Sequence, residues 1–186
     1  LGGIAKRLSS EIRKHDTSRP VTGALAGVIM SNHSDYPGTL DICGYNYTEN
    51  RYELDHAEYP DRVIYGSENG HSMGSWIAVK ENDFISAQFL WTGIDYLGES
   101  GAWPSRGGAG GLLNYAGFVK PRGEFRRALW NEKPVAYIGT STMDSNVRNL
   151  IRNAWPVWNY ADIEVVKVLA FTNSPKAKLL LNGKQV

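Results

Sequence analysis

The sequence predicts an α/β chain with a parallel sheet, followed near its end by the opening strands of an all-β sandwich. In the first part, short and almost continuously apolar segments alternate with polar or amphipathic ones, and acids or aromatic residues directly follow the apolar segments. Buried parallel strands have this character, and their functional side chains gather at the carboxyl edge of the sheet. From Ile163 onward, polar and apolar residues alternate instead, as in a sheet with one solvent face.

Four apolar segments are predicted to form the parallel strands. They are residues 21–25 (VTGAL), 40–47 (LDICGYNY), 62–68 (RVIYGSE) and 85–96 (ISAQFLWTGIDY). The second ends in Asn46 and Tyr47, and the third ends in Glu68. We therefore expect these polar side chains at one edge of the sheet. Residues 31–39 and the Gly-rich residues 97–117 are predicted to be loops.

Amphipathic and polar segments separate the predicted strands. Ile4, Leu8 and Ile12 recur every four residues, which predicts one apolar face of a helix. Shorter segments follow the same logic: residues 50–60 are a polar helix or turn, 74–84 a short helix and 121–132 a longer helix. Near the end, Asn182-Gly183 has the chemistry of a hairpin turn.

Composition excludes several classes of function. The net charge is +1 and the basic residues are scattered, so neither nucleic acid nor an acidic membrane surface is an expected partner. No apolar run is long enough to span a bilayer. The single cysteine, Cys43, excludes an internal disulfide framework, and no cluster has the spacing of metal ligands. Six Trp and ten Tyr suit sugar rings and apolar cores equally well.

Six segments, in order, carry a resemblance to a known family. They are DTSRPVT, DICGYNY, RVIYGSENGHSMG, QFLWTGIDYLGE, GLLNYAGFVKPRGEFRRALW and VVKVLAFTNSPKAKLLLNGK. Together they resemble the C-terminal half of the catalytic barrel of family 2 glycoside hydrolases, in the β-galactosidase branch, and the immunoglobulin-like domain that follows it. No single segment would suffice, but their order and spacing cover nearly the whole chain.

The resemblance implies a domain layout. Residues 1–135 would be the C-terminal half of a (β/α)8 TIM barrel, residues 136–160 a linker, and residues 161–186 the first strands of an immunoglobulin-like β-sandwich. Half a barrel exposes apolar strand edges, and the sandwich stops after its first strands, so we expect a fragment of a longer protein.

The resemblance also implies catalytic residues. Retaining glycosidases use two carboxylic acids about 5–5.5 Å apart, one of which attacks the anomeric carbon. Glu68 occupies the nucleophile's place; by position alone, a solvated acid at a strand end is as good an interpretation. Tyr47 would donate a hydrogen bond to the nucleophile, although Tyr45 is an alternative residue for this role. The structural alternative for Tyr47 is a side chain packed on the barrel rim.

Four residues are expected to bind substrate. Asn46 and His71 would contact sugar hydroxyls, Trp91 would form an apolar floor under the ring, and Trp103 would line an outer subsite. The structural alternatives are a turn residue for Asn46, a loop residue for His71, a core residue for Trp91 and an exposed loop residue for Trp103.

Other acids are expected to have structural roles. We expect Asp95 and Glu99 to brace loops, because the family pattern puts the acid/base in an Asn-Glu pair shortly upstream of Leu1. Glu49, Glu53, Asp55 and Glu58 are predicted to form a solvated face. Without its acid/base the isolated chain is expected to be inactive, since proton transfer supplies about 10²–10⁴-fold of the rate.

These observations predict part of a retaining exo-β-glycosidase that acts on carbohydrate, needs no cofactor, and most resembles β-galactosidases. The Asn-x-Lys motif of glucuronidases is absent, because Asn114 and Lys120 are too far apart. A β-glucuronidase, a β-mannosidase and a non-catalytic carbohydrate-binding module remain alternatives. The sequence leaves the oligomeric state open, and a homo-oligomer is one of the alternatives. A periplasmic or secreted bacterial location is expected from the resemblance alone.

Overall fold

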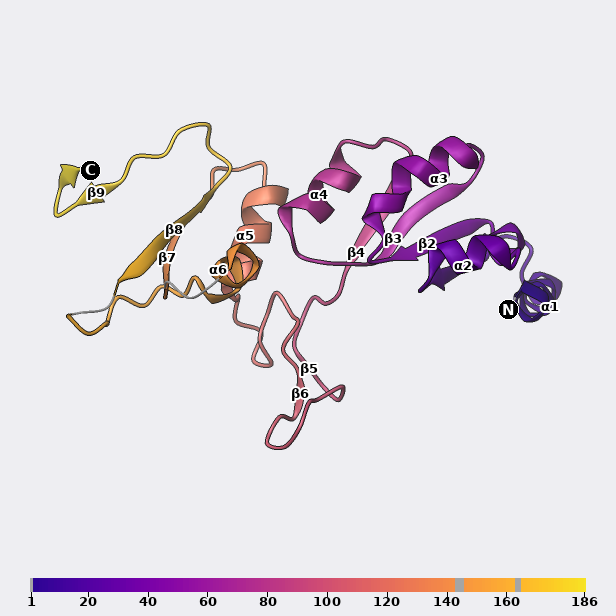
Figure 1. The fold of residues 1–186 in the computed structure, drawn as a ribbon, viewed down its shortest axis with the longest axis horizontal. Coiled ribbons are helices and arrows are strands. Elements are labelled where there is room, and N and C mark those ends of the chain that lie inside the picture. The colour runs from indigo at the N-terminus through magenta and orange to yellow at the C-terminus, as the bar shows by residue number, and fades with distance from the viewer. Residues whose placement is uncertain (1, 143–145, 163–164) are drawn as a thin grey trace. The chain divides into compact units, whose positions relative to one another are not determined.

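The structure, a computed structural model, describes residues 2–142, 146–162 and 165–186. Contacts divide the chain into two compact units, unit 1 (residues 1–91) and unit 2 (residues 92–186). Figure 1 shows the fold of each. Each unit is described by itself below. Ile163, where the alternating tail is predicted to begin, lies outside the described residues.

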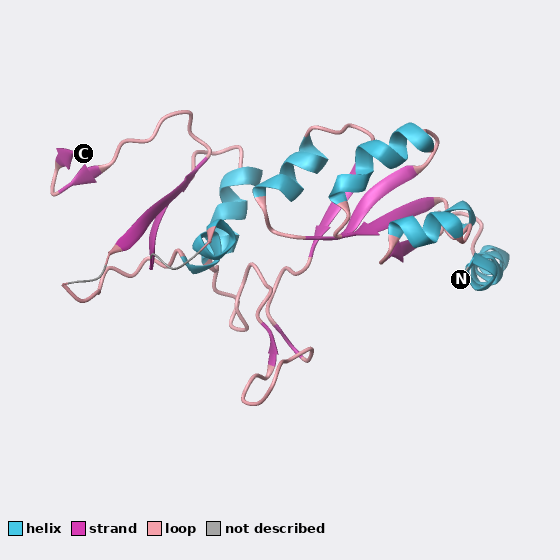
Figure 2. Ribbon diagram, viewed as in Figure 1, coloured by secondary structure: helices cyan, strands magenta, loops and turns pink. Residues whose placement is uncertain are grey.

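Unit 1 is built on a parallel sheet. Its strands are β1 (Thr22–Leu25), β2 (Ile42–Asn46), β3 (Val63–Asn69) and β4 (Ile85–Leu90), and its helices are α1 (Gly2–His15), α2 (Val28–His33), α3 (Tyr52–Glu58) and α4 (Met73–Lys80), with 3₁₀ turns η1 (Pro37–Thr39) and η2 (Glu49–Arg51). The four strands pair in the order β1-β2-β3-β4, every pair parallel. The predicted α/β arrangement with a parallel sheet is therefore confirmed, and Figure 2 shows how its strands and helices alternate.

Helices pack on one face of this sheet. The buried cluster comprises Leu25, Val28, Cys43, Tyr45, Tyr52, Ile64 and Ile85, with Ala78 and Val79 of α4 against it. Strand residues therefore meet α2, α3 and α4 on the same side. On the opposite face, Phe89 is 59% exposed and meets Tyr65 edge to face, with ring centroids 5.8 Å apart. We call this the open face.

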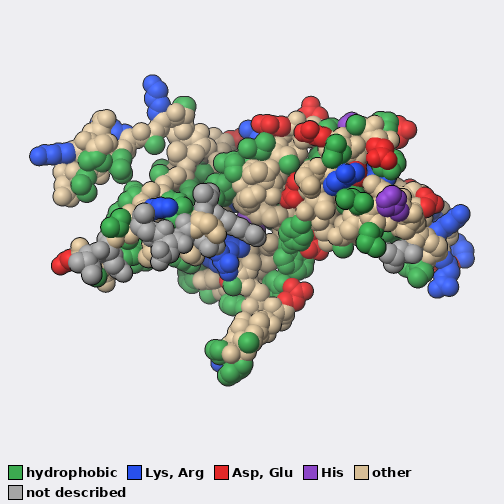
Figure 3. All heavy atoms as spheres, viewed as in Figure 1, with side chains coloured by type: hydrophobic (Ala, Val, Ile, Leu, Met, Phe, Trp, Pro, Cys, Tyr) green, Lys and Arg blue, Asp and Glu red, His purple; other side chains and the backbone are tan. Residues whose placement is uncertain are grey.

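Two helices at the start of unit 1 qualify the predictions. The helix over Ile4, Leu8 and Ile12 is confirmed as α1, but these three side chains are about half or more exposed. Figure 3 shows basic side chains gathered over the same helix. The predicted loop of residues 31–39 is wrong at residues 31–33, which end helix α2, and at residues 37–39, which form η1, but residues 34–36 have no helix or strand. In α2, Val28 is buried and the Ser31 hydroxyl donates to the Gly27 carbonyl oxygen.

Unit 2 begins with the Gly-rich segment. Its elements are β5 (Tyr96–Leu97), β6 (Gly107–Gly108), α5 (Pro121–Trp130), β7 (Ala136–Thr142), α6 (Val147–Asn153), β8 (Val166–Thr172), β9 (Leu180–Leu181) and β10 (Lys184–Gln185). The fourth predicted strand, residues 85–96, is shorter than expected. β4 ends at Leu90, and Tyr96 pairs with Gly108 in the two-residue ladder of β5 and β6 instead.

An antiparallel pair dominates the rest of unit 2. β7 and β8 pair along their whole length, from Ala136 opposite Thr172 to Thr142 opposite Val166, so residues 136–160, predicted as a linker, include a strand as well as α6. One buried cluster joins α5 to these strands and comprises Phe125, Ala128, Val135, Ala154 and Phe171. The predicted hairpin turn is confirmed, with Asn182 and Gly183 at φ 50° and 81° between β9 and β10.

Candidate active site

The carboxyl end of β3 carries a β-bulge at the position of Glu68. Tyr45 of β2 lies opposite Gly66, but the next residue, Asn46, lies opposite Glu68, so β3 has one extra residue there. Bulges re-aim side chains and are over-represented beside active sites. The extra residue is Ser67, whose hydroxyl donates a 2.6 Å hydrogen bond to the Asn46 side-chain oxygen. Asn46 is thereby held next to the half-buried Glu68.

Tyr47 is bound to Glu68 through the backbone. Its N–H donates to the Glu68 carbonyl oxygen at 2.8 Å, and its φ of 51° lies in the left-handed region that non-glycine residues rarely adopt. Such strain persists only where the surroundings impose it, and it concentrates at functional sites. The predicted hydrogen bond from the Tyr47 phenol to the Glu68 carboxylate stays a prediction.

Tyr45, the alternative partner of the nucleophile, lies on the helix-covered face. It is fully buried and its hydroxyl donates to Asp55 Oδ2 at 2.8 Å. Burial raises the pKa of Tyr45 well above its ordinary value, so its hydroxyl keeps its proton. Of the two tyrosines, Tyr47 is therefore the better candidate for a role at Glu68.

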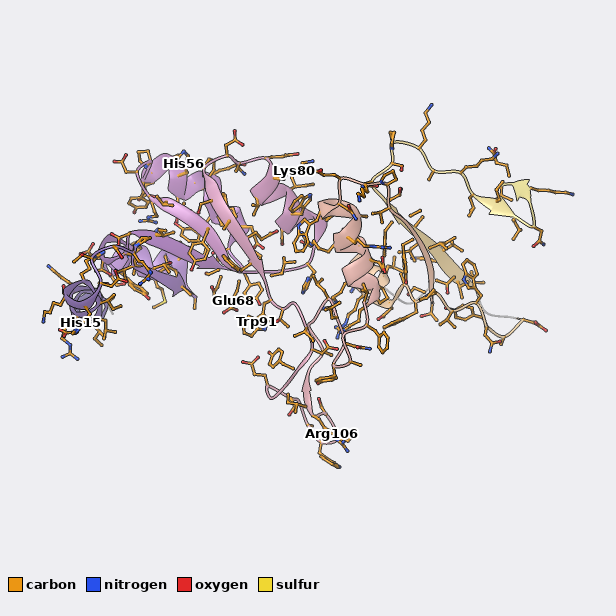
Figure 4. All side chains as sticks on the ribbon, turned by 180° about the vertical axis from the view of Figure 1, so that it is seen from behind. His15, His56, Glu68, Lys80, Trp91 and Arg106 are labelled. Atoms are coloured by element: carbon orange, nitrogen blue, oxygen red, sulfur yellow. The ribbon has the colours of Figure 1, made fainter. Side chains whose placement is uncertain are left out.

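Trp91 and His71 meet at the same edge of the sheet. The backbone N–H of Trp91 donates to the Asn69 carbonyl oxygen at 3.0 Å, which connects the residue after β4 to the residue after Glu68. His71 Nε2 lies 2.9 Å from the Trp91 carbonyl oxygen and, because a carbonyl only accepts, this nitrogen carries the proton. Figure 4 shows Glu68 and Trp91 close together at this edge. The structure thus brings together Glu68, Tyr47, Asn46, His71 and Trp91.

Asn69 is a residue of this site that the sequence patterns missed. It is fully buried, and its Nδ2 donates to Glu49 Oε1 at 2.7 Å. The Tyr52 hydroxyl lies 3.2 Å from its Nδ2 and 3.4 Å from its Oδ1. Burial raises the pKa of Tyr52 to about 12, so Tyr52 is neutral. The sequence shows only an amide directly after the candidate nucleophile, and the burial and partners of Asn69 become visible in the structure.

The predicted solvated acidic face is wrong for Asp55. Its side chain is fully buried, with an Arg51 guanidinium on Oδ1 and the Tyr45 hydroxyl on Oδ2. Arg62 lies 3.6 Å from the same carboxylate. A buried charge needs such partners, and Arg51, one helical turn earlier, was the available signal. Glu49 also differs from that prediction, through its bond to Asn69.

Unit 2 contains the remaining predicted residues. Trp103 is 81% exposed in the segment between β5 and β6, and its expected role stays a prediction. Asp95 braces the segment as expected, because its carboxylate accepts from the Gly111 N–H at 2.8 Å and from Lys120 Nζ at 2.8 and 3.0 Å. The Glu99 carboxylate accepts from the Tyr96 hydroxyl.

The described part of unit 2 also has an apolar groove of about 690 Å³. Ile94, Leu113, Val119 and Trp130 contribute to its lining, together with the buried Arg126. Burial lowers the pKa of Arg126 to about 10, which still leaves the guanidinium charged at neutral pH. This groove contains none of the predicted site residues.

Two searches of the described residues bear on the other predictions. None of their helices has the length and apolar character needed to cross a membrane. Among the same residues, no group of three or more His, Cys, Asp or Glu side chains is arranged to hold a metal ion. The expectation that no metal is needed stays a prediction.

Known proteins provide an independent comparison. No family model matches the chain. β-Galactosidase BoGH2A of Bacteroides ovatus is 24% identical over 230 residues, which cover 97% of this chain and 25% of that protein. A candidate β-glucuronidase of Formosa agariphila is 29% identical over 115 residues, 58% of this chain and 10% of that protein.

The solved structures include a close relative in fold. A glycosyl hydrolase family 2 member from Bacteroides cellulosilyticus is 30% identical, with a TM-score of 0.81 over 99% of this chain and 25% of that one. The chain thus spans about a quarter of the length of the relatives that it matches over nearly its full extent. The ordered motifs, the fold and these matches agree: the chain belongs to glycoside hydrolase family 2.

Proposed function

We propose that this chain is part of a retaining exo-β-glycosidase in which Glu68 is the nucleophile. The observation that carries the proposal is the bulge at the carboxyl end of β3, where backbone hydrogen bonds hold Tyr47 beside Glu68 and Trp91 beside Asn69. A nucleophile needs a rigid support, and the ends of paired strands provide one. At such a site a carboxylate can attack the anomeric carbon, a phenol can hydrogen-bond that carboxylate, and an indole can stack under the sugar ring.

The proposed fold around this site is the C-terminal part of a (β/α)8 barrel. Parallel strands in sequential order, with helices on one face, are the repeating unit of such a barrel. The open face, with Tyr65 and Phe89, would line the barrel interior. We place the start of the immunoglobulin-like sandwich at β7 rather than at residue 161, because β7 pairs with β8 over its whole length.

The proposed reaction has two displacements. The Glu68 carboxylate attacks the anomeric carbon and forms a glycosyl ester, while the glycosidic bond breaks and its electron pair leaves with the aglycone oxygen. That oxygen takes a proton from a second carboxylic acid, which the family pattern puts in an Asn-Glu pair upstream of this chain. The same group then removes a proton from water, which attacks the ester and releases Glu68.

A terminal β-galactoside is the proposed substrate. The relative BoGH2A is named a β-galactosidase and matches nearly the whole chain. Asn114 and Lys120, the residues nearest to a uronate-binding Asn-x-Lys motif, are engaged elsewhere: Asn114 accepts from the Phe118 N–H, and Lys120 is paired with Asp95. In this proposal His71 orients sugar hydroxyls and Trp91 stacks under the ring.

A β-glucuronide is the second candidate substrate, and the match to the candidate β-glucuronidase of Formosa agariphila supports it. Hydrolysis of nitrophenyl β-galactoside, β-glucuronide and β-mannoside by the full-length protein separates these possibilities. The highest kcat/KM should be for the galactoside. A higher value for the glucuronide would replace the galactoside in the proposal and leave the role of Glu68 intact.

The nucleophile is tested with Glu68→Gln and with a 2-deoxy-2-fluoro galactoside that traps the glycosyl ester. We expect Glu68→Gln to lower kcat by about 10³-fold or more, and the trapped sugar to lie on the tryptic peptide of residues 63–80. Glu53→Gln, a change of an exposed acid on α3, should leave kcat unchanged. A label on any other residue would refute the assignment, and sugar binding without turnover would favour a carbohydrate-binding module.

A further inference from the structure

We propose that Asn69 is the positioning residue of Glu68, acting through buried hydrogen bonds to Glu49 and Tyr52. This inference rests on the proposed function, in which Glu68 is the nucleophile. Asn69 follows Glu68 directly, is fully buried, and contacts elements on both sides of β3. Its backbone oxygen accepts from Trp91 at the end of β4, while its side chain reaches η2 and α3.

The orientation of the Asn69 amide is determined by its partners. An ionised carboxylate only accepts, so the nitrogen of the amide faces Glu49, at 2.7 Å. The Tyr52 hydroxyl lies 3.4 Å from the oxygen and 3.2 Å from the nitrogen of the amide, so it contacts both ends. Hydrogen bonds to a charged acceptor are roughly twice as strong as neutral ones, and inside a protein they are screened little. Asn69 is therefore held in one orientation.

Gly66 leaves the space that the Asn69 side chain fills. A Cβ at residue 66 would lie 1.6 Å from Asn69 Oδ1 and 2.8 Å from the Tyr52 hydroxyl oxygen. Successive residues of an extended strand point to opposite faces of the sheet. With Asn69 anchored on the side of Tyr52, which belongs to the helix-packed core, the preceding Glu68 is directed toward the open face.

The test exchanges donor and acceptor. Asn69→Asp keeps the shape of the side chain but sets a carboxylate against the carboxylate of Glu49 at hydrogen-bond distance, which like charges do not tolerate. Adding Glu49→Gln supplies an amide donor from the other side and restores a complementary pair. A purely spatial role for Asn69 would not respond to this second change.

The experiment measures kcat, KM and melting temperature of the full-length protein with nitrophenyl β-galactoside, well below the melting temperature. We expect Asn69→Asp to lower kcat at least tenfold with a change in KM of less than threefold, and the Glu49→Gln/Asn69→Asp double variant to recover to within threefold of wild type. Asn82→Asp is the matched control, because within the described part of the chain the Asn82 side chain donates to the Ala78 carbonyl oxygen in α4 rather than to Glu49 or Tyr52. Its kcat should equal that of wild type.

Three results overturn the inference. The first is a lower melting temperature of Asn69→Asp with unchanged kcat per folded molecule, and the second is a double variant no better than Asn69→Asp. If Asn69→Asp does not fold, Glu49→Ala takes its place, because it removes the acceptor alone and is expected to lower kcat. The third overturning result is a Glu49→Ala variant with the kcat of wild type.

Trapping with the fluorosugar separates this inference from the proposed function. If wild-type protein is not labelled at Glu68, the proposed function fails. If wild type is labelled at Glu68 and Asn69→Asp is labelled at the same rate, only the positioning role of Asn69 fails. Support requires labelling of both proteins at Glu68, with the rate at least tenfold lower in Asn69→Asp.

Discussion

Asp55 in unit 1 and Asp95 in unit 2 are both buried carboxylates, yet they hold different kinds of structure together. Asp55 lies on α3 and accepts from Tyr45 of β2, so it joins a helix to the sheet. Asp95 accepts from Gly111 and Lys120, so it joins distant parts of a loop segment that has little regular secondary structure. Asp55 adds side-chain hydrogen bonds to a sheet that backbone pairing already holds, whereas Asp95 cross-links a segment with little backbone pairing.

The difference follows from what the backbone supplies in each unit. In unit 1 the parallel ladders already align the strand ends, and side chains need only refine the position of Glu68. The segment before α5 has a ladder of two residue pairs, β5 with β6. Side chains supplement its scattered backbone hydrogen bonds, for example Arg122 at the Gly110 carbonyl and Asn114 at the Phe118 N–H.

The largest expected effect is that of Asp55→Ala. It leaves the partly buried guanidinium of Arg51 without its carboxylate and removes the acceptor of the Tyr45 hydroxyl. Breaking a buried ion pair from one side costs about 3–5 kcal/mol, so the free energy of unfolding of unit 1 should fall by that amount. Urea denaturation, with hydrogen exchange of the β2 and β3 amides, measures it.

Asp83→Ala is the matched control, because Asp83 is exposed and should change the free energy of unfolding by less than about 0.5 kcal/mol. A loss below about 1 kcal/mol for Asp55→Ala would show that its ion pairs add little to the stability of the sheet.

Asp95→Ala should cost less and act locally. Lys120 keeps its bond to the Ala109 carbonyl and is partly open to solvent, so we expect about 3 kcal/mol, the lower end of the range for broken buried pairs. The loss should appear as opening of residues 97–117 rather than unfolding of β7 and β8. Trypsin cleavage after Arg106, followed by mass spectrometry, measures that opening.

Glu132→Ala, a change of an exposed acid in the same unit, provides the baseline rate of cleavage. Equal cleavage of Asp95→Ala and Glu132→Ala would mean that the Asp95–Lys120 pair does not hold the loop.

Local patterns predicted the parallel sheet and the position of Glu68 because both depend on neighbours in sequence. The continuous apolar run before Glu68 indicates a buried strand, and Asn182-Gly183 favours a hairpin turn through its own backbone conformation. The linker expected over residues 136–160 came from the family resemblance, and no local pattern there indicated β7, which pairs with the distant β8.

The support of the site could not be predicted in this way. Asn69 meets Glu49 across twenty residues of sequence, and the bulge at Glu68 depends on how β3 pairs with both neighbours. Asp55 has the spacing of a surface acid on α3. Arg51, one helical turn earlier, indicates an ion pair, but the burial of that pair depends on the contact with Tyr45. Such contacts arise from tertiary packing. They have no characteristic separation in the sequence, so a periodic pattern does not reveal them.

Gly66→Ala tests how tightly the Asn69 side chain packs against the backbone of β3 at residue 66. The added methyl group would lie 1.6 Å from Asn69 Oδ1, so either the amide or the strand must move. Overpacking of this kind costs about 1–3 kcal/mol in the free energy of unfolding, and the bulge that aims Glu68 should be distorted. Urea denaturation and the rate of fluorosugar labelling measure the two effects.

Gly70→Ala is the natural comparison, since its added methyl group would meet only Ser75 Oγ, at an ordinary 3.6 Å. It should change stability and labelling little. If Gly66→Ala behaves like Gly70→Ala, the Asn69 side chain is not confined by the backbone at residue 66.

The smallest effect concerns Asp41, an exposed carboxylate that contrasts with Asp55. The Val21 N–H at 2.7 Å, and then Arg13 at 2.9 Å, lower the pKa of Asp41 below its ordinary value of 3.8. Because the folded state binds the proton more weakly than the unfolded state, the stabilisation is full above that value. It is lost as the pH falls through the lowered pKa.

Asp41→Asn should therefore lower the melting temperature slightly at neutral pH, and its difference from wild type should shrink on acidification to about pH 2.5. Asp61→Asn, for which no such partners are found among the described residues, controls for the general loss of a charge. A difference that grows toward low pH would contradict the assignment. Since the side chains of Arg13 and Asp41 are 41% and 45% exposed, salt should weaken the Arg13 contribution, whereas the buried pairs of Asp55 should resist it.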